Sequence, residues 1–132
     1  MYGLKTFALV DARMCYTANL EIYTGKQPIG PFAVSNKPTD VVKCLTNEIS
    51  ETGCNITVDN WFTSLELADY LLQKNLTLVG TIRKNKPEIL PEFTQTRNTE
   101  ISTALFGFQK NSTLMSYVAK KNKTDLLLST SR

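Results

Sequence analysis

The pattern of apolar and polar positions along the chain predicts paired strands, then alternating helices and strands, then strands again. Residues 4–10 form a strand-like run whose last four positions are all apolar, as in a buried strand. Residues 14–23 form a second strand-like run after a tight turn, and we expect the two strands to pair antiparallel. The stretch 24–31 is rich in Gly and Pro, so we expect a loop there.

Two helices and two buried strands are predicted in the middle of the chain. Pro38 stands near the start of the first helix, whose apolar residues recur on one face, and Gly53 lies past its end. The β-branched run 55–58 predicts a short buried strand, and the apolar run 76–82 predicts another. With a helix over 64–74 between them, the order of elements indicates an α/β fold with right-handed parallel crossovers.

The second helix has a start signal and an apolar face. Thr63 and Glu66 have the spacing of a capping box, which predicts that Thr63 caps the helix. Leu65, Ala68 and Leu72 then recur at helical spacing. We therefore expect these three side chains to face the core.

The last third of the chain has a different pattern. Pro87 and Pro91 interrupt any regular element after the strand 76–82. Short strands separated by polar turns are then predicted at 104–109, 114–119 and 125–129. This part of the chain is a predicted β-rich segment.

Composition narrows the function only by exclusion. The 132 residues are 42% apolar and 20% charged, as in a globular domain, and a net charge of +3 does not by itself indicate nucleic-acid binding. The absence of histidine excludes Ser-His and Cys-His nucleophiles and histidine-containing metal sites.

The three cysteines are odd in number and lack a Cys-x-x-Cys pair, so we expect reduced, structural thiols. With no signal peptide and no apolar run of about 20 residues, we expect an intracellular protein without a membrane span.

Two aspartates follow predicted buried strands. Asp11 ends the first strand, and Asp59 ends the strand at 55–58, directly before a helix. Because ligands gather outside the carboxyl ends of strands in open α/β sheets, Asp59 is well placed to bind a metal ion. The alternative is that Asp59 only terminates the strand, since Asp and Asn are common at strand ends.

Three cations follow the strand at 76–82, namely Arg83, Lys84 and Lys86. They could be a solvated charge run, or they could contact DNA phosphates, where cations bind by counterion release without reading sequence. The aromatic pair Trp61 and Phe62 also has two interpretations. Packing under the start of the helix is the favoured one, and base stacking is the alternative.

The run 55–72, with its core Asp-Asn-Trp-Phe-Thr-Ser at 59–64, resembles the segment that carries the second catalytic aspartate of piggyBac-type transposases. Further blocks resemble the same family in the same order. They lie at residues 2–5 with 10–11, 23–26, 41–45 and 79–86.

The resemblance implies a fold and a metal site. The fold is an RNase H-like mixed sheet with flanking helices at 1–84, followed by a β-rich insertion at 85–132, with the C-terminal part of the fold missing. Asp11 and Asp59 would be the first and second catalytic aspartates, on strands that lie side by side and parallel in such a sheet, and they would bind Mg²⁺, or Mn²⁺ as a substitute. The third aspartate follows a Gly-Val motif in the family, and no Gly-Val-Asp occurs here. Asp125 stands in the wrong context to replace it.

The implied function is that of a fragment of a cut-and-paste DNA transposase that acts at TTAA targets. Its expected partners are DNA, including transposon ends, and a second copy of the chain, and its expected location is the nucleus. The alternative is a domesticated, catalytically inert DNA- or protein-binding module. In either case, we expect apolar surface on the sheet face that the missing final helix would leave open.

Overall fold

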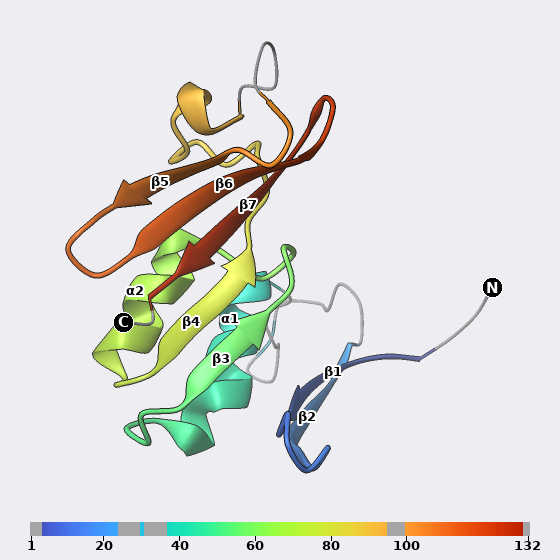
Figure 1. Cartoon of the computed structure of the whole chain (residues 1–132). Helices are drawn as coiled ribbons and strands as arrows, with labels where there is room; N and C mark the ends of the chain where they lie inside the picture. The colour runs from blue at the N-terminus through green and yellow to red at the C-terminus, as the bar shows by residue number, and fades with distance from the viewer. Residues whose placement is uncertain (1–3, 24–29, 31–36, 95–99, 131–132) are drawn as a thin grey trace. The chain divides into compact units, whose positions relative to one another are not determined.

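The computed structural model describes residues 4–23, 30, 37–94 and 100–130 (Figure 1). The chain divides into two compact units, Met1–Ser50 and Glu51–Arg132, and each is described by itself. The blocks at 2–5 and 23–26 and the predicted loop at 24–31 fall largely outside the described residues. None of the helices in the described part of the chain is long and apolar enough to cross a membrane.

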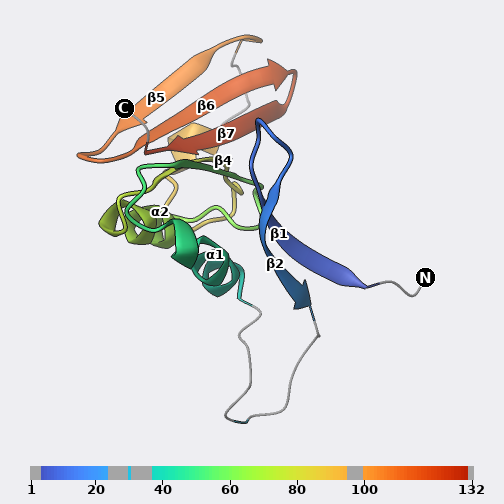
Figure 2. The ribbon, with the colours of Figure 1, turned by 90° about the horizontal axis from the view of Figure 1, so that it is seen from below.

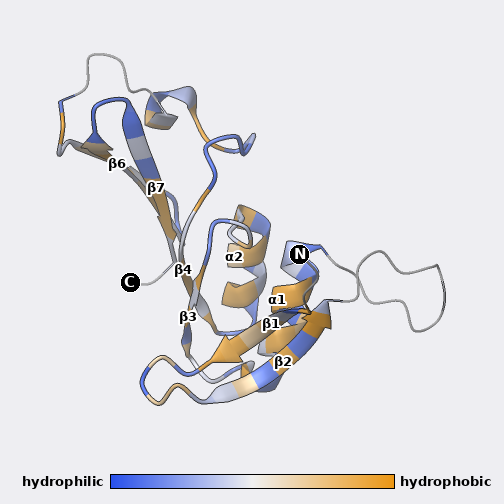
Figure 3. Ribbon diagram, turned by 90° about the vertical axis from the view of Figure 1, so that its right-hand side faces the viewer, coloured by the Kyte–Doolittle hydropathy of each residue, from blue (hydrophilic) through white to orange (hydrophobic). Residues whose placement is uncertain are grey.

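The first unit contains a two-stranded sheet and one helix. Strands β1 (Lys5–Val10) and β2 (Thr17–Tyr23) pair antiparallel, as predicted, with a register irregularity between Leu9 and Val10. Helix α1 (Pro38–Thr46) has its proline in the first turn and continues into a 3₁₀ turn at Asn47–Ile49. Figure 3 shows apolar positions along both strands and α1. The buried apolar side chains of this unit are Phe7, Val41, Val42 and Leu45.

The second unit is built on a five-stranded mixed sheet of order β3-β4-β7-β6-β5. Strand β3 (Asn55–Val58) pairs parallel with β4 (Thr77–Thr81), and α2 (Leu65–Gln73) connects them. The remaining neighbours pair antiparallel. These strands are β5 (Ala104–Phe108), β6 (Thr113–Lys120) and β7 (Lys123–Ser129). The predicted mixed α/β fold class is therefore confirmed.

Helix α2 begins one residue later than its sequence signal suggested. Ser64, not Thr63, is the N-cap, and its side-chain oxygen accepts a hydrogen bond from the backbone N–H of Leu67 at 3.1 Å. The predicted capping box between Thr63 and Glu66 is therefore wrong. The buried face of α2 also differs from the predicted one. Leu67 and Leu71 are fully buried with Ala68, whereas Leu65 and Leu72, which were expected to face the core, are half-buried.

The five-stranded sheet has one covered and one open face. Figures 2 and 3 show α2 and the 3₁₀ turn Pro91–Thr94 on the same side of the sheet. The covered face buries Val118, Leu126 and Leu128. Phe106 and Phe108 alternate with Gly107, which faces Phe93 of the 3₁₀ turn, and they remain 53% and 77% exposed. That this is the face that the missing final helix would cover stays a prediction.

The sheet is continuous across residue 84, where the catalytic core was expected to end. Strand β4 pairs with β7, and Thr130 fastens the end of β7 to Leu78. The Leu78 N–H donates to Thr130 Oγ1 at 2.7 Å, and the Thr130 N–H donates to the Leu78 carbonyl at 2.9 Å. Strands on both sides of residue 84 share one sheet, and the division into a core at 1–84 and an insertion at 85–132 stays a prediction.

The cysteines are free thiols, as predicted. Cys15, Cys44 and Cys54 are all exposed residues. Their exposure follows from their positions, since Cys15 and Cys54 lie in connecting segments outside the helices and strands, and Cys44 lies away from the buried stripe of α1.

Candidate metal and nucleic-acid site

The turn between β3 and α2 holds Asp59 through its backbone carbonyl. The N–H groups of Phe62 and Thr63 donate to the Asp59 carbonyl at 3.0 and 3.2 Å, and Thr63 Oγ1 donates to the same oxygen at 3.0 Å. Three donors from a single turn therefore fix the backbone at Asp59. The predicted position, at the carboxyl end of a strand and before a helix, is confirmed.

The carboxylate of Asp59 is exposed and only partly occupied by protein donors. Asp59 Oδ1 accepts a hydrogen bond from the Asn60 N–H at 2.6 Å. Within the described residues, Oδ2 accepts no hydrogen bond. One carboxylate oxygen is therefore available to an external ligand, while the other orients the group.

Asp11 lies in a comparable turn of the first unit, directly after β1. Its Oδ1 accepts hydrogen bonds from the N–H groups of Arg13 and Met14 at 2.8 and 3.0 Å. The Met14 N–H, followed by that of Arg13, holds the pKa of the Asp11 carboxyl below its ordinary value. The Asp11 side chain is therefore a carboxylate at neutral pH, the protonation state that a metal ligand needs.

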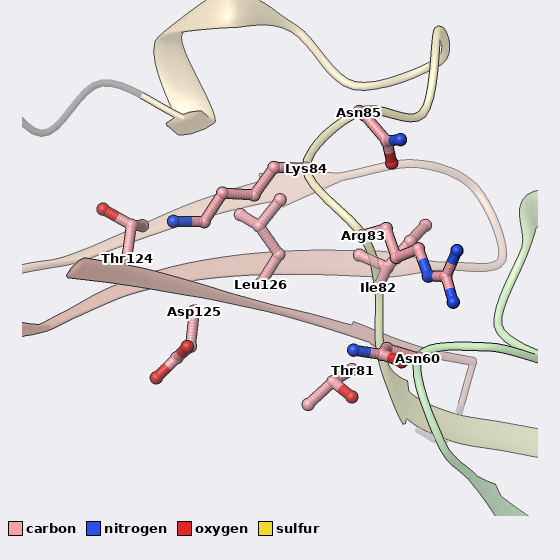
Figure 4. Close-up of a pocket in the computed structure, with 9 residues that line it drawn as sticks. All are labelled: Asn60, Thr81, Ile82, Arg83, Lys84, Asn85, Thr124, Asp125 and Leu126. Carbon is pink, nitrogen blue, oxygen red and sulfur yellow. The ribbon is translucent and has the colours of Figure 1, made fainter.

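The turn at Asp59 borders a hollow of about 460 Å³ that contains two of the three predicted DNA-binding cations. Arg83 and Lys84, which follow β4, line it together with Asn60. In Figure 4, the Lys84 side chain runs toward Thr124, whereas the Arg83 guanidinium points to the other side of the backbone. Lys86 does not line the hollow; its N–H closes a turn onto the Arg83 carbonyl at 3.4 Å.

Sequence reasoning missed the side of the hollow that β7 provides. Thr124, Asp125 and Leu126 line it because β7 pairs with β4. This pairing joins residues that are almost 50 positions apart, and no local pattern in the sequence indicates it. Asp125 thus lines the same hollow as two of the cations, although its sequence context gives it no role as a metal ligand.

Trp61 and Phe62 are half-buried. Their rings meet edge to face, with centroids 4.8 Å apart and planes at 79°, which is a favourable packing geometry for aromatic rings. The two rings therefore pack against each other in the turn, and the choice between core packing and base stacking stays open.

The donor chemistry of the site suits a hard divalent cation, but the set of ligands is incomplete. Mg²⁺ prefers carboxylate oxygens, which Asp11 and Asp59 supply. Among the described residues, no group of three His, Cys, Asp or Glu side chains could hold a metal ion. Asp11 belongs to the first unit and Asp59 to the second. The surroundings of each carboxylate are therefore described only within its own unit.

Comparison with known proteins defines the class as DNA transposases. The family model described as Transposase IS4 matches residues 1–132, and the chain belongs to this family of DDE-type transposases. Its fold matches that of piggyBac transposase in the cryo-EM structure of a synaptic complex with hairpin DNA, with a TM-score of 0.86 and 37% sequence identity. The match covers 98% of this chain and 27% of that chain, so the sequence spans about a quarter of that transposase. The predicted family is confirmed, and no curated protein matches the sequence.

Proposed function

We propose that the chain forms part of the catalytic core of a piggyBac-type cut-and-paste DNA transposase, with Asp11 and Asp59 as two of its three metal-binding aspartates. The observation that carries this proposal is the turn at Asp59. Its backbone is fixed by three hydrogen bonds, one carboxylate oxygen is oriented by Asn60, and the other accepts no hydrogen bond from the part of the chain that the structure describes. A carboxylate held in one orientation is what a metal site requires of its ligand.

The two aspartates would bind Mg²⁺, or Mn²⁺ in its place, and convergence on a shared pair of ions is part of the proposal. When bound, such ions activate the attacking oxygen and stabilise the leaving oxygen in phosphodiester cleavage. The backbone N–H groups of Met14 and Arg13 lower the pKa of the Asp11 carboxyl, and the Asn60 N–H orients the carboxylate of Asp59. The sequence contains no Gly-Val-Asp, so strand cleavage would require a third carboxylate from outside these residues.

Arg83, Lys84 and Lys86 would hold the phosphate backbone of DNA next to the Asp59 turn. Two of these cations, Arg83 and Lys84, line a hollow that is also lined by Asn60, the residue after Asp59. Such contacts position DNA without reading its sequence. The family resemblance supports transposon ends and TTAA targets as the DNA, a homodimer as the assembly, and the nucleus as the location.

Metal-dependent thermal unfolding tests this proposal. A cation that binds only the folded chain, present at ten times its Kd, should raise the free energy of unfolding by about 1.4 kcal/mol, or roughly 5 °C in the melting temperature. We expect Mn²⁺ to give this shift in the wild-type chain and not in Asp59→Ala. Asp69→Ala, which removes an exposed carboxylate from α2 of the same unit, is the matched control and should keep the shift.

A wild-type chain that melts cooperatively without any response to Mn²⁺ would contradict the proposed metal site. That result would favour the inert binding module as the function. A shift that persists in Asp59→Ala would also contradict the proposal, because it would place the bound metal elsewhere.

A further inference from the structure

The side chain of Thr63, the residue before the N-cap of α2, contacts the turn that carries Asp59. Its side chain is fully buried, and its hydroxyl donates to the Asp59 carbonyl at 3.0 Å. The N-cap role belongs to Ser64, so the Thr63 hydroxyl is not needed to satisfy the backbone of α2. The hydroxyl of Thr63 therefore stabilises the turn that carries Asp59.

Gly80 on β4 provides the space for this contact. A Cβ atom at position 80 would lie 2.6 Å from Thr63 Oγ1 and 2.7 Å from the Val58 carbonyl oxygen. Both distances are too short for real contacts, and Val58 is the register partner of Gly80 in the parallel pair. Gly80 therefore allows close approach by the residue before Asp59 and by the side chain that holds the Asp59 carbonyl.

We infer that Thr63 and Gly80 are positioning residues for Asp59, acting through the Thr63 hydroxyl and the space that glycine leaves beside it. Neither residue supplies a ligand to the metal. Their role is to fix the Asp59 backbone, so that the carboxylate keeps the orientation set by its bond with Asn60. The part of this inference that concerns metal affinity rests on the proposed function.

Conservative substitutions separate the hydroxyl from the shape of Thr63. Thr63→Val keeps the size and removes the donor, whereas Thr63→Ser keeps the donor. Gly80→Ala fills the space beside Thr63 Oγ1. Because Gly80→Ala also approaches the Val58 carbonyl and could prevent folding, the two Thr63 variants carry the test.

Two measurements on the 132-residue chain report the position of Asp59. The first is the backbone amide NMR signal of Asn60, whose N–H donates to Asp59 Oδ1. The second is the Kd for Mn²⁺. We expect Thr63→Val to move the Asn60 signal and to raise the Kd roughly tenfold, as the loss of an outer-shell partner does at metal sites. Thr63→Ser should stay close to wild type in both.

Thr46→Val is the matched control for lost stability. Thr46 is also a buried threonine, and its hydroxyl donates to the carbonyl four residues earlier, that of Val42, at 2.7 Å. The control therefore removes the same kind of hydrogen bond from α1. It should destabilise the chain to a similar degree while leaving the Asn60 signal and the Kd for Mn²⁺ unchanged.

The outcomes distinguish this inference from the proposed function. An unchanged Asn60 signal in Thr63→Val would overturn the positioning role, whatever the chain does with metal. A moved Asn60 signal supports the role, and it does so even if wild type and Asp59→Ala bind Mn²⁺ equally weakly, a result that would contradict only the proposed metal site. Equal Mn²⁺ affinities of a metal-binding wild type and Thr63→Val would also overturn the inference.

Discussion

At the scale of single residues, backbone donors orient both candidate metal ligands. Asp11 takes two N–H donors from the turn that follows it, and Asp59 takes one at its side chain and two at its carbonyl. Backbone N–H groups lose little conformational freedom when they hold a carboxylate, unlike long cationic side chains. The side chains of Arg13 and Asn60 are therefore not needed for this orientation, because only their backbone N–H groups donate.

Cys44 offers a residue-scale test of the electrostatics of the first unit. Partial desolvation raises the pKa of its thiol, and the nearby Glu21 carboxylate raises it further by its charge and by a hydrogen bond. A raised pKa lowers the thiolate fraction near pH 8, so alkylation should be slow. We expect Glu21→Gln to speed the alkylation of Cys44 by iodoacetamide severalfold, as followed by mass spectrometry.

The alkylation rate of Cys54, measured in the same samples, is the internal control for this test. Cys54 lies in the second unit, so its alkylation rate should not respond to Glu21→Gln. Equal rates for Cys44 in the wild type and the variant would contradict the proposed effect of Glu21 on the thiol.

At the scale of elements, local patterns predicted the existence and type of the strands and helices but not their finest details. The start of α2 is an example. Thr63 and Ser64 are both suited to an N-cap, and Thr63 also has Glu66 at capping-box spacing. Ser64 is the N-cap because the side chain of Thr63 is buried between the Asp59 carbonyl and Gly80. That contact depends on the pairing of β3 with β4, which no local pattern contains.

The segment after β4 provides an element-scale prediction. If Arg83, Lys84 and Lys86 contact phosphates, each substitution by Ala should reduce the slope of log Kobs against log salt concentration by about 0.9. Fluorescence anisotropy with a labelled DNA duplex at several salt concentrations measures this slope. Affinity should fall to a similar degree for different DNA sequences, because phosphate contacts do not read bases.

Lys121→Ala is the control for the salt dependence, since Lys121 is an exposed lysine in the turn between β6 and β7. It carries the same charge outside the segment after β4. A slope that changes as much in Lys121→Ala as in the three variants would mean that binding reflects net charge alone, contrary to the proposed contact.

At the scale of the whole molecule, the two compact units each have buried residues of their own, and each contains one of the two candidate aspartates. The sequence predicted both aspartates by their positions after strands, and the family resemblance assigned them to one site. The hollow beside Asp59 was not predictable in the same way, because its β7 side depends on pairing between β4 and a strand almost 50 residues later.

The most direct test of the central claim is paramagnetic broadening of amide NMR signals by Mn²⁺ in the ¹⁵N-labelled chain. If Asp11 and Asp59 share a metal site, the signals next to both residues should lose intensity together at the same low Mn²⁺ concentration. Asp59→Ala should abolish the broadening at both places. Broadening confined to one aspartate, or broadening near Asp11 that survives in Asp59→Ala, would contradict a shared site.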